Sequence, residues 1–341
     1  MDIENLLKQL QNWTNKVPLI ILGSGASVPF GLPSMWALGE YIKKNVTLDD
    51  AADLEQFEEF KKVFDETGDL ETTLLFLRLG KNVLLEIVSR TWEMVNSIDL
   101  EAYEKIIADP NGFPLLRFIQ YLLSTADKKL TIVTTNYDRL GEYAASLAKA
   151  VICTGYAQNY MGHFSAQIHT NKFSAARGFN GQVDIWKVHG SLDWFKNAQD
   201  ENFQLPLRHK KPEGFTPLIV TPGLSKYSET HMEPYRTIFA QADNAIAEAK
   251  GFFCLGYGFN DAHVQPKLIA EIKNNKPIVV LTKQLTPKTK QSIIDNGCKN
   301  YILFEEAPDG GTQVFSSSFG DFIIPGQSTW VLEEYLKLII S

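Results

Sequence analysis

Three polar side chains that could bind or react with a ligand follow two short apolar runs of the sequence. Asn136 and Asp138 follow the run LTIVT, and His189 follows the run VDIWKV. Histidine exchanges protons near neutral pH, so His189 is a candidate general base. Asn136 and Asp138 would lie at the carboxyl end of a buried strand, where open α/β folds bind ligands. A turn-forming asparagine and a helix-capping aspartate are the structural alternatives at these two positions.

A glycine-rich segment, GSGASVPFGLPS, follows the first apolar run of the chain. Gly23 and Gly25 would let the backbone approach a diphosphate and present its N–H groups at a helix start. Val28 stands where the third glycine of the dehydrogenase pattern belongs, and no strand ending in Asp or Glu follows about 20 residues later. The segment therefore indicates nucleotide binding and disfavours ordinary hydride transfer, with a tight turn as the alternative.

A second glycine-bearing turn occurs in the segment FFCLGYGFNDAHV. Gly256 and Gly258 can again admit the close approach of a ligand. Asn260 and Asp261 are suited either to contact ribose hydroxyls or to cap the helix that follows.

Buried parallel strands would bring these polar segments together. Short apolar runs that end in glycine or polar residues predict the strands, and helical patterns at 233–250 and 288–296 supply crossover connections. We therefore predict an α/β fold with a Rossmann-like, mostly parallel, doubly wound sheet. Such sheets bind ligands at the carboxyl ends of their strands. The predicted strands are 18–22, 130–134, 183–188, 217–220, 251–255, 277–281 and 301–304.

The remaining segments suggest one domain over residues 1–341 with two additions. Helical patterns at 54–64, 71–95 and 101–108 predict a helical subdomain inserted at about 40–125. The segment 157–181 is typical of a loop or irregular hairpin near the active face. Residues 307–341 predict a C-terminal hairpin, with its turn at 309–311, and a last helix at 329–340. This addition either covers the sheet edge or contacts a partner or another copy of the chain.

Composition excludes several classes of protein. The 341 residues are 44% hydrophobic and 21% charged, with a net charge of -7, which is typical of a folded protein and disfavours direct nucleic-acid binding. Cys153, Cys254 and Cys298 form no Cys-x-x-Cys pair, so neither structural zinc nor any other metal is expected. The N-terminus predicts an amphipathic helix rather than a signal peptide, and no run reaches the roughly 20 apolar residues of a membrane span. We expect a cytoplasmic protein.

Four sequence blocks together resemble the signature of a known family. GSGAS with GLPS, TTNYD, VHGS and GYGFND occur in this order, over roughly residues 18–285, as they do in sirtuin-like domains. The blocks are most similar to those of the sirtuin-like NADases of bacterial antiphage defence. The resemblance implies a Rossmann-like fold that uses NAD+ as its substrate.

The resemblance also implies roles for individual residues. His189 matches the catalytic histidine, and Asn136 and Asp138 match the Asn and Asp of the family's pattern for the second block, TTNYD. The Asn136 amide would then hold ribose hydroxyls or an attacking water, and Asp138 would orient that network. The residues from Gly23 to Ser27 would line the NAD diphosphate and the nicotinamide ribose, and Gly256 and Tyr257 would lie at the adenosine half. The complete set expected to bind NAD is Gly23, Ser24, Gly25, Ala26, Ser27, Pro33, Thr135, Gly190, Ser191, Gly256, Tyr257 and Asn260.

Two departures separate this sequence from the protein-deacylating sirtuins. Ser34, Met35 and Trp36 stand where those enzymes have Asp-Phe-Arg, and the four-cysteine zinc module is missing. The resemblance thus favours an NAD+ glycohydrolase that releases nicotinamide and ADP-ribose, or a cyclised product, and so depletes NAD in abortive infection. A protein deacylase and a non-catalytic module that senses NAD or ADP-ribose are the alternatives.

The resemblance further implies that such an enzyme acts in an assembly. We expect a homo-oligomer, with a HerA-like hexameric ATPase or an Argonaute-like protein as candidate activating partners. Neither direct nucleic-acid binding nor membrane association is expected.

Overall fold

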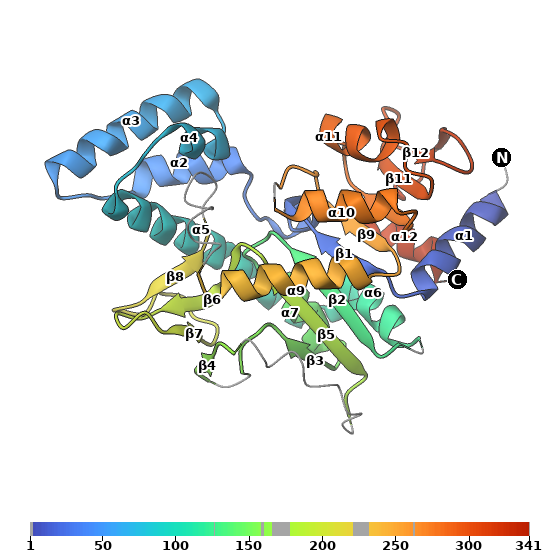
Figure 1. Cartoon of the computed structure of the whole chain (residues 1–341), viewed down its shortest axis with the longest axis horizontal. Helices are drawn as coiled ribbons and strands as arrows, with labels where there is room; N and C mark the ends of the chain where they lie inside the picture. The colour runs from blue at the N-terminus through green and yellow to red at the C-terminus, as the bar shows by residue number, and fades with distance from the viewer. Residues whose placement is uncertain are drawn as a thin grey trace.

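A nine-stranded sheet carries most of the apolar runs of the sequence (Figure 1). The computed structural model describes residues 3–125, 127–157, 160–165, 178–220, 232–261 and 263–340. The strand order is β13-β12-β11-β10-β9-β1-β2-β5-β3. The strands span Leu19–Leu22 (β1), Lys129–Thr134 (β2), Ala150–Cys153 (β3), Gly181–Lys187 (β5), Phe252–Leu255 (β9), Ile278–Leu281 (β10), Tyr301–Glu306 (β11), Thr312–Ser316 (β12) and Phe322–Ile324 (β13).

Neighbouring strands from β11 to β3 are parallel, whereas β12 and β13 are antiparallel additions at one edge. Helices cover both faces of this sheet, which confirms the predicted doubly wound α/β fold. One face packs against α1 (Ile3–Asn15), α6 (Pro114–Leu123), α7 (Leu140–Leu147) and α12 (Leu332–Ile339). The other face packs against α9 (Tyr235–Glu248) and α10 (Val264–Lys273), with the short α11 (Pro287–Lys290) and the π-helical turn Gln291–Asp295 nearby.

One predicted strand of the parallel sheet was assigned to the wrong sheet. The run 217–220 forms β8 (Thr216–Ile219), which pairs antiparallel with β6 (Gly190–Lys196) in a second sheet of order β4-β7-β6-β8. Gly190 has a φ of +86°, so the chain reverses directly after β5 and leaves the main sheet. The unpredicted strand β3 takes an edge position beside β5. The small sheet is completed by β4 (Gly162–His163) and β7 (Asn202–Gln204).

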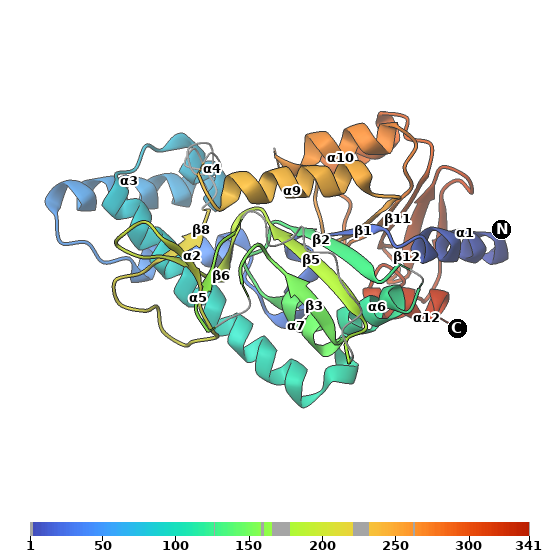
Figure 2. The same cartoon turned by 60° about the horizontal axis from the view of Figure 1, so that its bottom comes forward.

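A second module lies at the end of the molecule opposite the two chain termini (Figures 1 and 2). Its helices are α2 (Met35–Asn45), α3 (Ala51–Thr67), α4 (Leu70–Phe76) and the first half of α5 (Lys81–Ala108). These helices share a hydrophobic core with the small sheet, in which the Trp92 ring packs on Phe195 and its Nε1 donates to the carbonyl of Leu192. The helical segment and the small sheet therefore form one packed unit.

The helices within this segment differ in detail from the sequence patterns. The pattern at 71–95 is broken at 77–80, where Gly80 precedes α5, and the patterns at 81–95 and 101–108 form one continuous helix. The second half of α5 leaves the helical module and packs on the main sheet through Ala102 and Ile106. One long helix thus connects both cores.

The C-terminal residues extend and cover the main sheet. β12 and β13 lengthen its edge, and α12 packs beside α1, where the Thr14 and Tyr335 hydroxyls lie 3.3 Å apart. None of the described helices combines the length and the apolar composition that a bilayer crossing requires. Most of the loop predicted at 157–181 lies outside the described residues, which omit 158–159 and 166–177.

Candidate active site

Two glycine loops meet where the strand order changes direction. β1 lies between β2 and β9, so the chain continues to opposite sides of β1 at this point, and open α/β sheets bind ligands in the crevice that results. The Gly23 amide donates to Leu255 O at 3.0 Å, and the Gly25 amide donates to Gly256 O at 3.0 Å. A Cβ on Gly23 would lie 2.4 Å from Gly256 O, and one on Gly256 would lie 2.2 Å from Ala26 N. The glycines therefore allow backbone to pack on backbone.

The loop after β1 does not start an α-helix, contrary to the sequence prediction. It forms two 3₁₀ turns, Ser24–Ala26 and Val28–Phe30, and α2 begins only at Met35, where the Ser34 hydroxyl accepts a hydrogen bond from the Ala37 amide. Pro29 and Pro33 lack the N–H groups that a continuous helix would need. The loop thus stays close to the strand ends instead of leaving as a helix.

Register places four of the expected residues in equivalent positions on adjacent strands. Leu22 pairs with Thr134 of β2 and Leu255 of β9, and Thr134 pairs with Lys187 of β5. The residues two positions beyond these paired ends are Ser24, Asn136, His189 and Tyr257. Parallel pairing alone therefore brings the four residues to one edge of the sheet.

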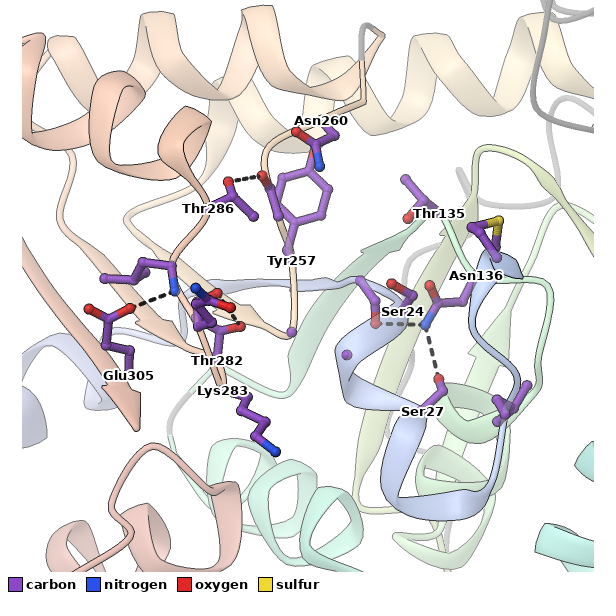
Figure 3. A pocket seen from close by; sticks show the side chains of 18 of the residues that line it. Ser24, Ser27, Thr135, Asn136, Tyr257, Asn260, Thr282, Lys283, Thr286 and Glu305 are labelled. Carbon is purple, nitrogen blue, oxygen red and sulfur yellow. Dashed lines mark hydrogen bonds between the residues drawn. The ribbon is translucent and has the colours of Figure 1, made fainter. Parts of the chain in front are cut away.

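A cleft of about 1570 Å³ lies over this edge (Figure 3). It extends from Asp69 and Glu71 on α4 to Gln313 and Asp321 near the C-terminal strands, a length of lining that suits a dinucleotide. Ala26, Gly190 and Ser191 do not line it. The expected site residues that do are Gly23, Ser24, Gly25, Ser27, Pro33, Thr135, Asn136, Asp138, His189, Gly256, Tyr257 and Asn260.

Asn136 is fixed on the cleft floor by its side-chain amide. Nδ2 donates to Gly23 O at 2.9 Å and to Ser27 Oγ at 3.0 Å (Figure 3). The Ser27 hydroxyl donates in turn to Asp138 Oδ2 at 2.7 Å. Because both Nδ2 protons are held by the floor, the Asn136 side chain presents its carbonyl oxygen as the remaining polar atom.

Asp138 lies beneath this network and is 6% exposed. Its Oδ1 accepts a hydrogen bond from the Leu140 amide at 3.2 Å, so it also caps the start of α7, as one of the two sequence alternatives had it. Burial raises the pKa of the Asp138 carboxyl, and the nearby Lys187 ammonium opposes that rise. The buried Lys187 donates to Asp138 O and lies 3.1 Å from Glu142 Oε1.

A second buried charge cluster holds the same loop from the side of α5. Asp99, which is fully buried, accepts hydrogen bonds from the Arg139 amide at 2.7 Å and from its Nη2 at 2.6 Å. Arg139 Nη2 also donates to Asn96 Oδ1, and the Tyr143 hydroxyl donates to Asp99. The long helix of the second module therefore anchors the loop that carries Asn136.

His189 occupies the turn between β5 and β6. Its backbone is fixed because Val220 N donates to His189 O at 2.9 Å, and its ring Nε2 lies 2.9 Å from Asp261 Oδ2. The separation is that of an ion pair, while the ring N–H direction departs from a linear hydrogen bond. Asp261 Oδ1 accepts from the amides of His263 at 3.0 Å and Val264 at 2.9 Å. The sequence predicted a capping or ribose-binding role for Asp261 and did not indicate its contact with His189.

Two residues expected to bind the ligand, Gly190 and Ser191, do not line the cleft but have clear roles in the fold. A Cβ on Gly190 would lie 2.0 Å from Leu218 O, so this glycine allows β6 and β8 to approach each other. Ser191 is fully buried beside it. Both residues follow His189 in the VHGS block, where the chain reverses after β5 at Gly190.

At the other end of the cleft, residues that the sequence did not indicate lie beside the expected Tyr257 and Asn260. The Thr286 hydroxyl donates to Gly258 O at 2.7 Å, and Glu305 accepts from the Leu285 amide at 2.8 Å, which fixes the loop after β10 (Figure 3). Tyr257 is 3% exposed and packs on Phe259, and burial raises the pKa of its hydroxyl. Asn260 is exposed above them. Among the described residues, no group of three His, Cys, Asp or Glu side chains is arranged to hold a metal ion.

Comparison with known proteins finds a similarity to one family in the central part of the chain. Residues 130–293 match the family model of the SIR2-like domain. The matched segment includes β2, β5 and β9 with Asn136, His189 and Asp261, whereas the glycine loop after β1 precedes it. No curated protein matches the chain in sequence.

The solved structures to which this chain is similar include several Sir2 proteins. A Sir2 homologue in complex with NAD is 14% identical, with a TM-score of 0.42 over 88% of this chain and 87% of the other. A structure described as the basis for the mechanism and regulation of Sir2 enzymes is 13% identical, with a TM-score of 0.48 over 98% of this chain and 96% of the other.

Proposed function

We propose that this protein is an NAD+ glycohydrolase, which cleaves the bond between nicotinamide and ribose. One observation carries the proposal: within the segment that matches the SIR2-like domain, Asn136 and His189 occupy equivalent positions beyond adjacent parallel strands, beside the junction of two glycine loops. A diphosphate above that junction would extend the nicotinamide ribose toward Asn136 and His189. The adenosine half would extend toward Tyr257, Asn260 and the loop after β10.

The reaction consumes NAD+ and water and yields nicotinamide, ADP-ribose and a proton. Nicotinamide leaves as a neutral group from a positively charged pyridinium, so the anomeric carbon develops oxocarbenium character and accepts a weak nucleophile. The fixed carbonyl of Asn136 is suited to hold the attacking water or a ribose hydroxyl, because its amide protons are committed to Gly23 and Ser27. His189 would accept the proton that the water releases.

The position of Asp138 favours a supporting role for this residue beside the direct roles of Asn136 and His189. Asp138 touches Ser27 and lies beneath Asn136, so it holds the network in place instead of contacting the ribose. In the proposal Asp138 is therefore a positioning residue, which refines the catalytic role expected from the sequence.

In the cell, we propose, the reaction depletes NAD during phage infection and stops the host before the phage multiplies. This part rests on the resemblance of the four sequence blocks to those of defence NADases. It includes activation through a homo-oligomer or a partner such as a HerA-like ATPase or an Argonaute-like protein.

Release of nicotinamide from NAD+ by the purified chain, alone and with candidate partners, tests the proposal. We expect Asn136→Ala and His189→Ala each to reduce the turnover rate roughly 10²–10³-fold, because each removes a group that acts on the transition state. Asn82→Ala and His209→Ala are matched controls at exposed positions outside the cleft and should keep the parental rate. Parental turnover in both site variants would remove Asn136 and His189 from the mechanism, and tight NAD+ binding without turnover would favour a sensor.

A further inference from the structure

We propose that Asp261 is a positioning residue for His189: its carboxylate holds one ring nitrogen and so determines which nitrogen is available as the base. The inference rests on the proposed function for its catalytic consequence. The position of the proton on the neutral His189 ring can be tested without reference to that function.

The contact joins two distant segments of the chain inside the protein. His189 Nε2 lies 2.9 Å from Asp261 Oδ2, and the side chains are 9% and 6% exposed. His189 follows β5, whereas Asp261 follows β9, and β1 and β2 separate these strands in the sheet. A carboxylate on one loop that contacts a buried imidazole on another is a specific arrangement, since a buried ionised group requires a partner.

The two carboxylate oxygens of Asp261 have different partners. Oδ1 accepts hydrogen bonds from the His263 and Val264 amides at the start of α10, where a helix favours a negative charge. These donors fix the orientation of the carboxylate, and Oδ2 is thereby directed to His189. Capping alone would need only one oxygen.

A neutral imidazole carries its proton on one nitrogen and accepts a proton on the other. Oδ2 is an acceptor 2.9 Å from Nε2, so it favours the neutral ring with its proton on Nε2, once the ring turns to align that N–H with Oδ2. Nδ1 is then the nitrogen that can take a proton from water or a ribose hydroxyl. When Nδ1 accepts that proton, the ring becomes a cation and the Asp261 carboxylate stabilises it.

Asp261→Asn separates this role from capping. Asparagine caps helices about as well as aspartate, so its oxygen can keep both amide contacts and the start of α10. Its Nδ2 would replace Oδ2 and donate toward Nε2, which would move the ring proton to Nδ1 and block the base. We expect the turnover rate to fall roughly 10²–10⁴-fold with KM within about threefold of the parental value.

Asp261→Ser is the matched control, since serine also caps helices but is too short to donate to the ring in the same way. We expect a smaller loss of turnover than in Asp261→Asn. A purely structural role predicts the reverse order, because asparagine is the closer replacement in size. Equal or greater loss in the serine variant would therefore contradict the proposal.

The ring state is measured separately from activity by ¹⁵N NMR of the histidine side chains in the full chain. His189 is one of six histidines and is assigned from the signal missing in His189→Gln. We expect the proton of the neutral ring on Nε2 in the parent and on Nδ1 in Asp261→Asn. An unchanged proton position in Asp261→Asn would overturn the inference, whatever the enzyme assay shows. If the ring proton moves from Nε2 to Nδ1 in Asp261→Asn but the parent shows no NADase activity, the inference stands and only the proposed function is rejected.

Discussion

The two sides of the cleft floor are held together by different forces. At the glycine junction, the loops after β1 and β9 touch through backbone atoms, and no side chain fits between Gly23, Gly25 and Gly256. Beside it, the loop after β2 is held by buried charged side chains. Asp99 pairs with Arg139, and Lys187 pairs with Glu142 and donates to the main-chain carbonyl of Asp138. Close backbone packing therefore fixes the glycine junction, whereas interactions of buried charged side chains fix the loop after β2.

This difference separates the binding surface from the reactive groups. A close backbone junction gives a rigid surface whose amides are set by the fold, which suits a constant part of a ligand such as a diphosphate. Buried charges instead hold a polar loop in one arrangement, and they do so only while every partner is present. Substitutions should therefore affect the two sides in distinguishable ways.

The largest effect is expected from Asp99→Ala on the charged side. The change leaves the buried Arg139 guanidinium without its carboxylate, which should lower the free energy of unfolding by about 3–5 kcal/mol. Chemical denaturation measures this loss, with the exposed Glu101→Ala on the same helix as the control. A loss below about 1 kcal/mol would show that the cluster does not hold the loop.

Gly256→Ala should have the next largest effect, now on the side fixed by shape. Its Cβ would lie 2.2 Å from Ala26 N, and its φ of +59° is unfavourable for alanine, so we expect a loss of about 2–4 kcal/mol. Gly297→Ala is the matched control, because its φ is +70° but nothing lies within 4 Å of the added Cβ. Equal melting temperatures for both variants would mean that backbone conformation matters at Gly256 and close packing does not.

A smaller, pH-dependent effect is expected at Glu142. Burial raises the pKa of its carboxyl from 4.5 to about 7, although Lys187 opposes the rise. The folded state therefore binds this proton more tightly than the unfolded state, so the stabilisation is complete below the unfolded pKa and is lost as the pH rises through about 7. Between about pH 5 and about pH 8, the parent should lose about 1–3 kcal/mol more stability than Glu142→Gln. Parallel stability curves for the two proteins would exclude this contribution.

The sequence predicted the main sheet because its strands are short apolar runs with clear ends. Strand ends were sufficient to place Asn136 and His189 together, since parallel register fixes which residues meet at an edge. The same reasoning failed for the run 217–220, because an apolar run does not show which sheet it joins. That choice depends on the chain reversal after β5, which the positive φ angle of Gly190 makes possible.

Side-chain partners were harder to predict than strand ends. The sequence showed that Asp261 precedes a helix, but the contact with His189 bridges two intervening strands and depends on the path of the loop after β9. In the same way, the helix expected after Gly25 is replaced by 3₁₀ turns because two prolines follow within the loop. Local patterns thus predict elements, whereas contacts between loops follow only from the assembled fold.

The most direct test of the central claim is the fate of water during NAD+ cleavage. The purified chain, with any partner required for activity, is incubated with NAD+ in water enriched in ¹⁸O, and the products are analysed by mass spectrometry beside His189→Ala. The account predicts equal amounts of nicotinamide and of ADP-ribose carrying one ¹⁸O atom from the attacking water, with both greatly reduced in the variant. Nicotinamide release with no labelled ADP-ribose, or labelled product at the parental rate in His189→Ala, would contradict it.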